Sequence, residues 1–319
     1  MQVFKVGTYK SAVEPYIAEQ MSDANREQVS SYQQSIWNNM LKDVAKSRKT
    51  TAEALNSLAD SLTILSGPEA SVKGGLVDKL CYQDEVKKIL KNKAKMEEDE
   101  SLRFVSISDV ALSEELNDKV DDEIAVYYAY GEIKEDITGG FAQESAITSK
   151  QMTKDLQELR EDDDVKAVVL RVNSPGGSAY ASEQIWREVQ LLSKEKPVIV
   201  SMGALAASGG YYISCGANKI FAEPTTLTGS IGIFGMIPDA TELLTDKLGL
   251  SFDVVKTNAH SDFGAMGRPL NESECRLMQA YINQGYELFT GRVAQGRKIS
   301  QDSVKAVAEG RVWTGEQDM

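Results

Sequence analysis

Gly203-Ala204-Leu205-Ala206-Ala207-Ser208-Gly209-Gly210-Tyr211-Tyr212 is the stretch from which the organisation of this chain can be worked out. It follows the apolar run Val198-Ile199-Val200, which indicates a buried strand, and it precedes a short helical pattern that ends near Gly216. A serine at such a turn faces free N–H groups and the positive end of a helix dipole, and small neighbours let another backbone approach closely. These features suit a nucleophile that generates an oxyanion. A small-residue helix start packed against a neighbour would look the same.

Composition narrows the class of protein. The 319 residues are enough for two domains, and a hydrophobic content of 42% is enough to form cores. The net charge of −13 argues against nucleic acid as a partner and weakly against docking on anionic lipid. Cys81, Cys215 and Cys275 lack metal-type spacing, and their odd number prevents a fully paired disulfide framework. We therefore expect no metal or other cofactor. The sequence has no run of 18 apolar residues and no signal-peptide pattern, so we expect the chain as given to be soluble.

Hydrophobic periodicity divides the chain into two parts. Residues 1–10 alternate like a strand, residues 22–46 carry the apolar stripe of a long helix, and residues 74–78 form a turn before a last short helix. Residues 92–123 are strongly charged, which indicates a solvated linker. Beyond them strands and helices alternate, which predicts parallel strands with crossover helices and hence an α/β fold. The expected strands are residues 124–130, 166–172, 198–202 and 219–222, and the expected helices are residues 148–160 and 178–193.

The chain also repeats itself. A shift of 249 positions aligns Tyr32 with Tyr281 and Arg48-Lys49 with Arg297-Lys298, and several apolar positions match as well. Such self-similarity indicates that one structural unit occurs twice in the protein. The counterpart of residue 75 would be residue 324, so we expect a fragment that is truncated at both ends. We assign residues 1–95 to the tail of the first repeat, residues 96–123 to a charged linker and residues 124–319 to most of the second repeat.

Three turn motifs follow one another in the α/β part. Asn173-Ser174-Pro175-Gly176-Gly177-Ser178 ends one strand with a Pro-Gly turn, and its glycines can leave a backbone N–H pointing into a site. Ser208 comes at the end of the next strand, so a glycine amide from the first turn and the Gly209 amide can converge on one oxyanion, as acyl transfer requires. Thr226-Leu227-Thr228-Gly229-Ser230-Ile231-Gly232 is a second hydroxyl-rich turn. An ordinary structural turn is the alternative explanation for the first motif.

Together with Gly7-Thr8-Tyr9-Lys10-Ser11-Ala12-Val13-Glu14-Pro15, these motifs make the chain resemble the long, two-repeat bacterial form of the signal peptide peptidase A family. The resemblance implies a duplicated Clp-protease/crotonase-like spiral of strand-strand-helix units. It also implies a serine endopeptidase that degrades cleaved signal peptides and other unfolded apolar peptides. A homotetramer at the outward, periplasmic side of the cytoplasmic membrane is implied as well, anchored by an N-terminal segment that this sequence lacks. The implied site residues are the nucleophile Ser208, the general base Lys10, the lysine-orienting Ser230 and the oxyanion donors Gly177 and Gly209.

The sequence also indicates which residue acts as the general base, independently of the resemblance. A serine nucleophile needs a base, normally histidine, and the only histidine here is His260. His260 sits beside Ala259, which the repeat aligns with Lys10. Repeat two thus carries the serine without the lysine, which indicates that the two repeats share one site. A base lysine must be neutral, and burial can lower its pKa from about 10.4 to near 7–8.

The environment of Lys10 gives two further expectations. Tyr9 and Tyr211 are candidate walls of the pocket that would bury the amine, and ordinary core residues are the alternative interpretation of both. Because Lys10 lies near the start of the sequence and the sheet partners of its strand would belong to the missing half of repeat one, we expect that strand to fray. With a frayed strand, this chain would hydrolyse peptides at least about a hundredfold more slowly than the full-length protein.

Other functions fit parts of the pattern. An α/β-hydrolase would need a Gly-x-Ser-x-Gly elbow and a later Asp–His pair, for which only Asp253 and His260 remain. A Clp-type Ser-His-Asp protease would need a histidine near Ser208, and this sequence has none there. A crotonase-like acyl-CoA enzyme uses similar oxyanion turns without a serine nucleophile. A non-catalytic scaffold of the same fold that binds apolar peptides is the alternative from a different class.

Overall fold

The structure is a computed structural model that describes residues 1–107, 109–110, 122–136 and 146–317. The chain forms two compact units: the sheet unit, Met1–Ile36 with Asp122–Met319, and the helical unit, Trp37–Asp121. The units therefore do not divide at residue 95, because the first 36 residues pack with the α/β part. The repeat boundaries themselves stay a prediction, and much of the expected linker at residues 96–123 lies outside the described residues.

A six-stranded sheet forms the centre of the sheet unit, in the order β10-β8-β6-β5-β2, with β7 also beside β6. All neighbouring strands are parallel except β10, which pairs antiparallel with β8. This arrangement confirms the predicted α/β class, although the strand before Ser208 is longer than expected. The strands are β2 (Glu123–Tyr130), β5 (Val165–Ser174), β6 (Val198–Ala207), β7 (Lys219–Phe221), β8 (Leu227–Gly229) and β10 (Val312–Thr314).

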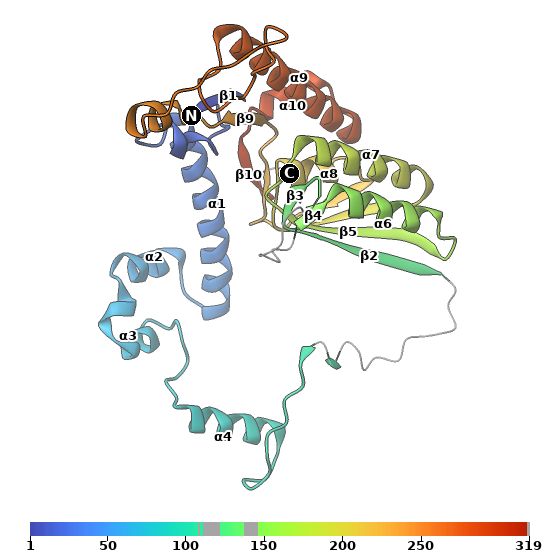
Figure 1. Cartoon of the computed structure of the whole chain (residues 1–319). Coiled ribbons are helices and arrows are strands. Elements are labelled where there is room, and N and C mark those ends of the chain that lie inside the picture. Colours follow the sequence, from blue (N-terminus) through green and yellow to red (C-terminus); the bar gives the residue numbers. More distant parts are fainter. Residues whose placement is uncertain (108, 111–121, 137–145, 318–319) are drawn as a thin grey trace. The chain divides into compact units, whose positions relative to one another are not determined.

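Two crossover helices, α6 (Ser149–Glu161) and α7 (Ala179–Glu195), lie side by side over one face of this sheet (Figure 1). Leu170 of β5 and Ile185 of α7 are fully buried in the core that the sheet and helices share. The Ser178 hydroxyl starts α7 by accepting a hydrogen bond from the Ala181 amide at 3.2 Å. The helix therefore begins directly after the Pro-Gly turn, which fixes where that turn lies at the sheet edge. A short parallel pair precedes α6, formed by β3 (Glu132–Lys134) and β4 (Ala146–Thr148).

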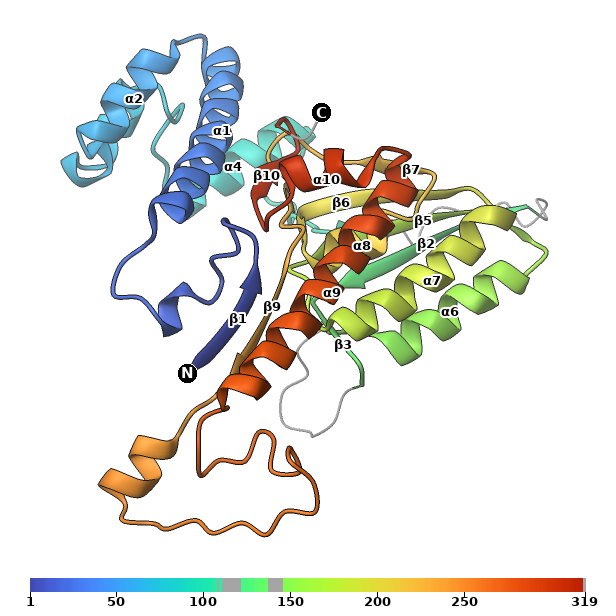
Figure 2. The same ribbon diagram turned by 90° about the horizontal axis from the view of Figure 1, so that it is seen from above.

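The start of the chain belongs to a second, two-stranded sheet. β1 (Gln2–Val6) pairs antiparallel with β9 (Ile233–Ile237), and α9 (Glu272–Arg297) runs along this pair (Figure 2). Phe4 of β1 is buried against residues of α9 and of the segment before it. The expectation that the strand before Lys10 lacks its sheet partners is thus wrong, and the expected fraying loses its basis. The strand is also shorter than predicted, since residues 7–10 lie beyond it.

The sequence repeat corresponds to a helical element that occurs twice. α1 (Asp23–Arg48) and α9 are both 26 residues long, and each end of α9 lies 249 positions beyond the matching end of α1. Each helix is followed by a lysine with left-handed backbone, Lys49 at φ 54° and Lys298 at φ 57°. The next helices, α2 (Ala52–Asp60) and α10 (Gln301–Val307), are capped by hydroxyls that are again 249 positions apart, those of Thr51 and Ser300.

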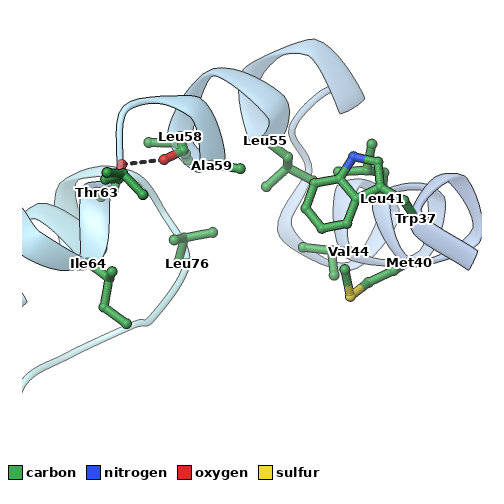
Figure 3. A pocket seen from close by; sticks show the side chains of 11 residues that line it. Trp37, Met40, Leu41, Val44, Leu55, Leu58, Ala59, Thr63, Ile64 and Leu76 are labelled. Carbon is green, nitrogen blue, oxygen red and sulfur yellow. Dashed lines mark hydrogen bonds between the residues drawn. The ribbon is translucent and has the colours of Figure 1, made fainter. Parts of the chain in front are cut away.

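The helical unit contains the C-terminal part of α1, α2, α3 (Pro68–Lys73) and α4 (Gln83–Ala94). Figure 3 shows its apolar cavity of about 310 Å³, where the Thr63 hydroxyl donates to the Leu58 carbonyl at 2.8 Å. No lining residue is ionisable, and the Thr63 hydroxyl is bonded to a backbone carbonyl, so the cavity offers packing surface without an acid–base group. The lining residues are Trp37, Met40, Leu41, Val44, Leu55, Leu58, Ala59, Leu62, Thr63, Ile64 and Leu76.

The described part of the chain also contains 3-10 and π-helical segments. They are the 3-10 turns Glu14–Tyr16 and Thr63–Ser66 and the π-helical segment Leu243–Lys247. None of the helices in that part of the chain combines the length and the apolar composition required to span a bilayer.

Candidate active site

Ser208 occupies a sharp turn between β6 and the short helix α8 (Gly209–Ser214). Its backbone has φ 54° and ψ −119°, a conformation that costs a residue with a Cβ roughly 1–3 kcal/mol. The surrounding backbone holds it there: the Ser208 amide donates to Gly229 O at 2.9 Å, and the Ser208 carbonyl accepts from the Tyr212 amide at 2.9 Å. The hydroxyl makes no helix-capping bond and lines a cavity instead. The strained turn thus presents the Oγ atom to that cavity.

The amine of Lys10 lies beside this hydroxyl. Lys10 Nζ is 3.3 Å from Ser208 Oγ, and it donates to Ser230 O at 3.1 Å and to Ser230 Oγ at 3.0 Å. The turn after β1 carries Lys10 into place, where the Tyr9 amide donates to Glu309 O at 3.0 Å. The structure therefore brings Lys10 to two serines that the sequence also singles out and that lie 198 and 220 positions further along the chain.

Burial changes the chemistry of the lysine. Only 4% of Lys10 is exposed, because the backbones of Gly232 and Gly310 pack against its aliphatic stem and Phe234 lies beyond the amine. This burial lowers the pKa of Lys10 from 10.5 to about 8, since removal from water disfavours the charged form. At pH 7 about one amine in ten is then neutral, compared with fewer than about one in a thousand for an exposed lysine.

Ser230 owes its position to the edge of the large sheet. It follows β8 with φ 51°, and its amide donates to Arg311 O at 2.7 Å. Arg311 comes immediately before β10, which pairs with β8. The β8–β10 pairing therefore places both oxygen atoms of Ser230 at the Lys10 amine.

The two glycine turns pack closely beside Ser208. A Cβ atom built on Gly176 would lie 2.5 Å from the Gly209 amide nitrogen, and one built on Gly209 would lie 3.2 Å from the Gly177 amide nitrogen. The first turn is anchored by Ile133, whose amide donates to Gly176 O and whose carbonyl accepts from the Ser178 amide, both at 2.8 Å. Within the described residues, neither the Gly177 nor the Gly209 amide has a hydrogen-bond partner. Two unpaired N–H groups thus lie next to the candidate nucleophile.

A cavity of about 370 Å³ opens in front of these groups, and its walls are mainly apolar. Tyr212 forms part of the wall, where its ring packs on Phe289 with centroids 4.4 Å apart and its hydroxyl donates to Glu183 at 2.7 Å. The expectation that Tyr9 and Tyr211 form the walls is wrong. Tyr9 instead binds Glu27 and Arg311 through its hydroxyl, and Tyr211 belongs to the core. The large apolar and aromatic residues of the walls are Tyr212, Ile233, Phe234, Met278, Tyr281, Ile282 and Phe289.

The histidine and aspartate that a hydrolase triad would use do not line this cavity. His260 is half-exposed, and its Nδ1 lies 3.5 Å from Glu274 Oε1, beside an ion pair between Arg268 and Glu274. Asp253 is exposed and accepts a hydrogen bond from the Val254 amide. Of the candidate bases, only Lys10 is therefore placed at Ser208.

The segment at residues 309–312 also belongs to the site, and the sequence motifs described above do not include it. It binds the Tyr9 amide through Glu309, packs on the Lys10 stem through Gly310 and holds the Ser230 amide through Arg311. A glycine between a helix and a short β-branched and aromatic run marks it in the sequence, which indicates a turn into a strand. That local pattern does not indicate which distant residue the turn would contact.

Comparison with known proteins gives consistent matches. The sequence pattern of peptidase family S49 matches residues 1–97 and 190–319, and that of Clp protease matches residues 118–227. Protease 4 of Salmonella typhi is 39% identical over 322 residues, covering 98% of this chain and 51% of that protein. The chloroplastic serine protease SPPA of Arabidopsis thaliana is 33% identical over 324 residues, covering 99% and 47%. A putative signal peptide peptidase SppA of Enterococcus faecium is 39% identical over 163 residues, covering 51% and 47%.

These matches involve both ends of the chain and the segment between them. The chain spans about half the length of the curated relatives it matches. The Clp protease match over the central strands agrees with the parallel sheet and crossover helices, and it confirms the expected Clp-protease/crotonase-like fold. The S49 match includes the segments that carry Lys10, Ser208 and Ser230. The chain belongs to peptidase family S49.

Proposed function

We propose that this chain is a serine endopeptidase in which Ser208 is the nucleophile and Lys10 is the general base. The observation that carries the proposal is the buried Lys10 amine, which lies 3.3 Å from Ser208 Oγ and has a pKa of about 8. Two of the relatives are named as proteases, one of them a serine protease, which agrees with peptide hydrolysis. A neutral amine at that distance can remove the hydroxyl proton.

The number of hydrogen bonds that a neutral Lys10 amine can make supports its role as the general base. A neutral amine has two N–H groups and one lone pair. Ser230 O and Ser230 Oγ can accept the two N–H groups, at 3.1 and 3.0 Å, which leaves the lone pair for the Ser208 hydroxyl. As Oγ attacks the peptide carbonyl carbon, its proton passes to Nζ, and the ammonium then donates it to the departing amine. Water hydrolyses the resulting ester of Ser208, with Lys10 again accepting a proton.

The tetrahedral intermediate of each step carries a negative charge on the former carbonyl oxygen. We propose that the Gly177 and Gly209 amides donate to this oxygen. Their N–H groups lie beside Ser208 and have no partner in the described part of the chain. A donor of this kind contributes roughly a hundred- to a thousandfold in rate.

The substrates we propose are unfolded apolar peptides, including cleaved signal peptides. The walls of the cavity beside Ser208 are mainly apolar, so they favour apolar side chains. One relative is named a putative signal peptide peptidase. A homotetramer at the outward side of the cytoplasmic membrane is part of the proposal and rests on the family resemblance.

A fluorophosphonate probe tests the nucleophile and the base together. The probe is expected to label Ser208, with a rate that rises with pH and has its midpoint near pH 8, because the base is charged and inactive below its pKa. Peptide mapping identifies the labelled residue, and the labelling rate is measured from pH 5 to 10. A midpoint near pH 4–5 would indicate a carboxylate base, and absence of labelling at every pH would favour a non-catalytic scaffold.

The proposed substrate class can be examined with two peptides of equal length. A peptide rich in leucine and alanine is expected to be cleaved at least about tenfold faster than a charged one, because charged side chains lose their hydration against apolar walls. The kcat/KM values for the two peptides give the comparison. Equal rates, or faster cleavage of the charged peptide, would contradict the assignment.

A further inference from the structure

Gln28 is a buried polar residue on α1, at 2% exposure. Its Nε2 donates to Tyr9 O at 2.9 Å and to Ser11 Oγ at 2.8 Å, and these two residues flank Lys10. Nε2 also lies 3.2 Å from Asn25 Oδ1. A buried side-chain amide whose groups are bonded fixes the orientation of its partners and is costly to disrupt.

The other end of the same amide reaches the edge of the large sheet. Gln28 Oε1 accepts from the Val312 amide at 3.1 Å. Val312 is the first residue of β10 and pairs with Gly229, while the preceding carbonyl, that of Arg311, holds the Ser230 amide. One carboxamide therefore joins the turn that carries Lys10 to the strand that holds Ser230.

We propose that Gln28 is a positioning residue that holds the Lys10 amine between Ser230 and Ser208. The inference rests on the proposed Ser-Lys function. Gln28 does not line the cavity beside Ser208, and no hydrogen bond joins it to the Lys10 amine. It acts on Lys10 through the backbone of Tyr9 and the hydroxyl of Ser11.

Loss of these bonds would change how well Lys10 is shielded from water. The amine is kept from water by packing on its stem, and this burial is the cause of its lowered pKa. A turn released from α1 and β10 admits water to the stem, so the charged amine is less disfavoured. The charged groups that lie near this turn are Lys5 on β1, Glu14 after it, Glu27 on α1, Glu132 on β3, and Glu309 and Arg311 before β10, and the titratable Tyr9 hydroxyl in the turn bonds Glu27 and Arg311.

Gln28→Met is the variant that separates an effect on the Lys10 pKa from a general loss of stability. Methionine keeps the length of the side chain and removes its hydrogen bonds, and it leaves all the surrounding charges in place. Gln33→Met is the matched control, since Gln33 lies on the same helix and is exposed. The measured quantity is the rate of Ser208 labelling by a fluorophosphonate as a function of pH. In parallel, competitive acylation of the Lys10 amine with acetic anhydride reads the pKa of Lys10 without requiring activity.

Gln28→Met is expected to raise the labelling midpoint by about one pH unit. The rate then falls about tenfold at pH 7 and returns to within about twofold of the unchanged protein at pH 10. Gln33→Met is expected to leave the midpoint unchanged. A lower melting temperature with an unchanged midpoint would show a purely structural role for Gln28 and overturn the inference.

Two further outcomes keep the test decisive. If Ser208 of the unchanged protein is never labelled, the proposed function fails, and the acylation experiment still shows whether Gln28→Met raises the Lys10 pKa. If Gln28→Met does not fold, Ser11→Ala replaces it, because it removes one of the same bonds. A rise of the Lys10 midpoint in Ser11→Ala supports the inference, and an unchanged midpoint overturns it.

Discussion

Ser208→Ala and Lys10→Ala are each expected to reduce peptide hydrolysis by roughly four to six orders of magnitude, and the double variant to be no slower than the worse single variant. The two side chains lie 3.3 Å apart and would act as one unit, so removing either already removes nucleophilic catalysis. The residual rate would come from the oxyanion donors and from substrate binding. The measurement is kcat/KM for one fluorogenic peptide in all four proteins.

His260→Ala provides the control for this experiment. His260 contacts Glu274 and does not line the cavity, so its removal is expected to change kcat/KM by less than about threefold. Loss of activity in His260→Ala combined with activity in Lys10→Ala would disprove a lysine base. Losses that multiply in the double variant would show that Ser208 and Lys10 act separately.

The second large effect is expected from Gly310→Ala. A Cβ atom at this position would lie 2.7 Å from Lys10 Cβ and 2.8 Å from both Lys10 Cα and Cδ, closer than such atoms can approach. The backbone and stem of Lys10 must then move, which draws the amine away from Ser208 and Ser230. Hydrolysis is expected to fall at least about a hundredfold, the lower range for loss of a general base.

Gly264→Ala separates this clash from backbone strain. Gly264 and Gly310 have nearly equal φ angles, 74° and 76°, but nothing lies within 4 Å of a Cβ built on Gly264. Both variants therefore carry a similar cost for a left-handed alanine, about 1–2 kcal/mol, and only one of them meets Lys10. Gly264→Ala is expected to keep kcat/KM within about twofold. If the two variants lose activity equally, while circular dichroism shows both folded, the packing of Gly310 on Lys10 does not matter for catalysis.

Most of the local structure could be predicted from the sequence. The alternation of strand and helix patterns indicates the parallel strands, and the 249-residue shift indicates a helical element that occurs twice with matching ends. Ser208 follows from small residues at a strand-to-helix turn, and the presence of a single histidine supports the assignment of Lys10 as the base. The Gly209 amide follows from the same turn, and the family resemblance adds Lys10, Ser230 and the choice of Gly177. These signals are short-range, because periodicity, caps and turns depend on neighbouring residues.

The expectations that failed concern contacts over long sequence distances. The sequence does not show that β1 pairs with β9, and this pairing is why the segment before Lys10 does not lack its partners. Nor does it show which aromatic rings line the cavity: Tyr212 and Phe234 do, and the neighbouring Tyr211 does not. A tyrosine one position along a helix turns toward a different surface, and only the packing decides which of these surfaces is the site.

The sequence by itself thus determined the fold class, the turns and the identity of the groups that can react. The tertiary structure alone decided that Lys10 meets Ser208 and that its pKa falls to about 8. The pKa depends on how much water is excluded from the amine, and the exclusion comes from Gly232, Gly310 and Phe234, which the chain brings together from distant positions. A lysine in a short motif has the same chemistry as any other lysine until that packing removes it from water.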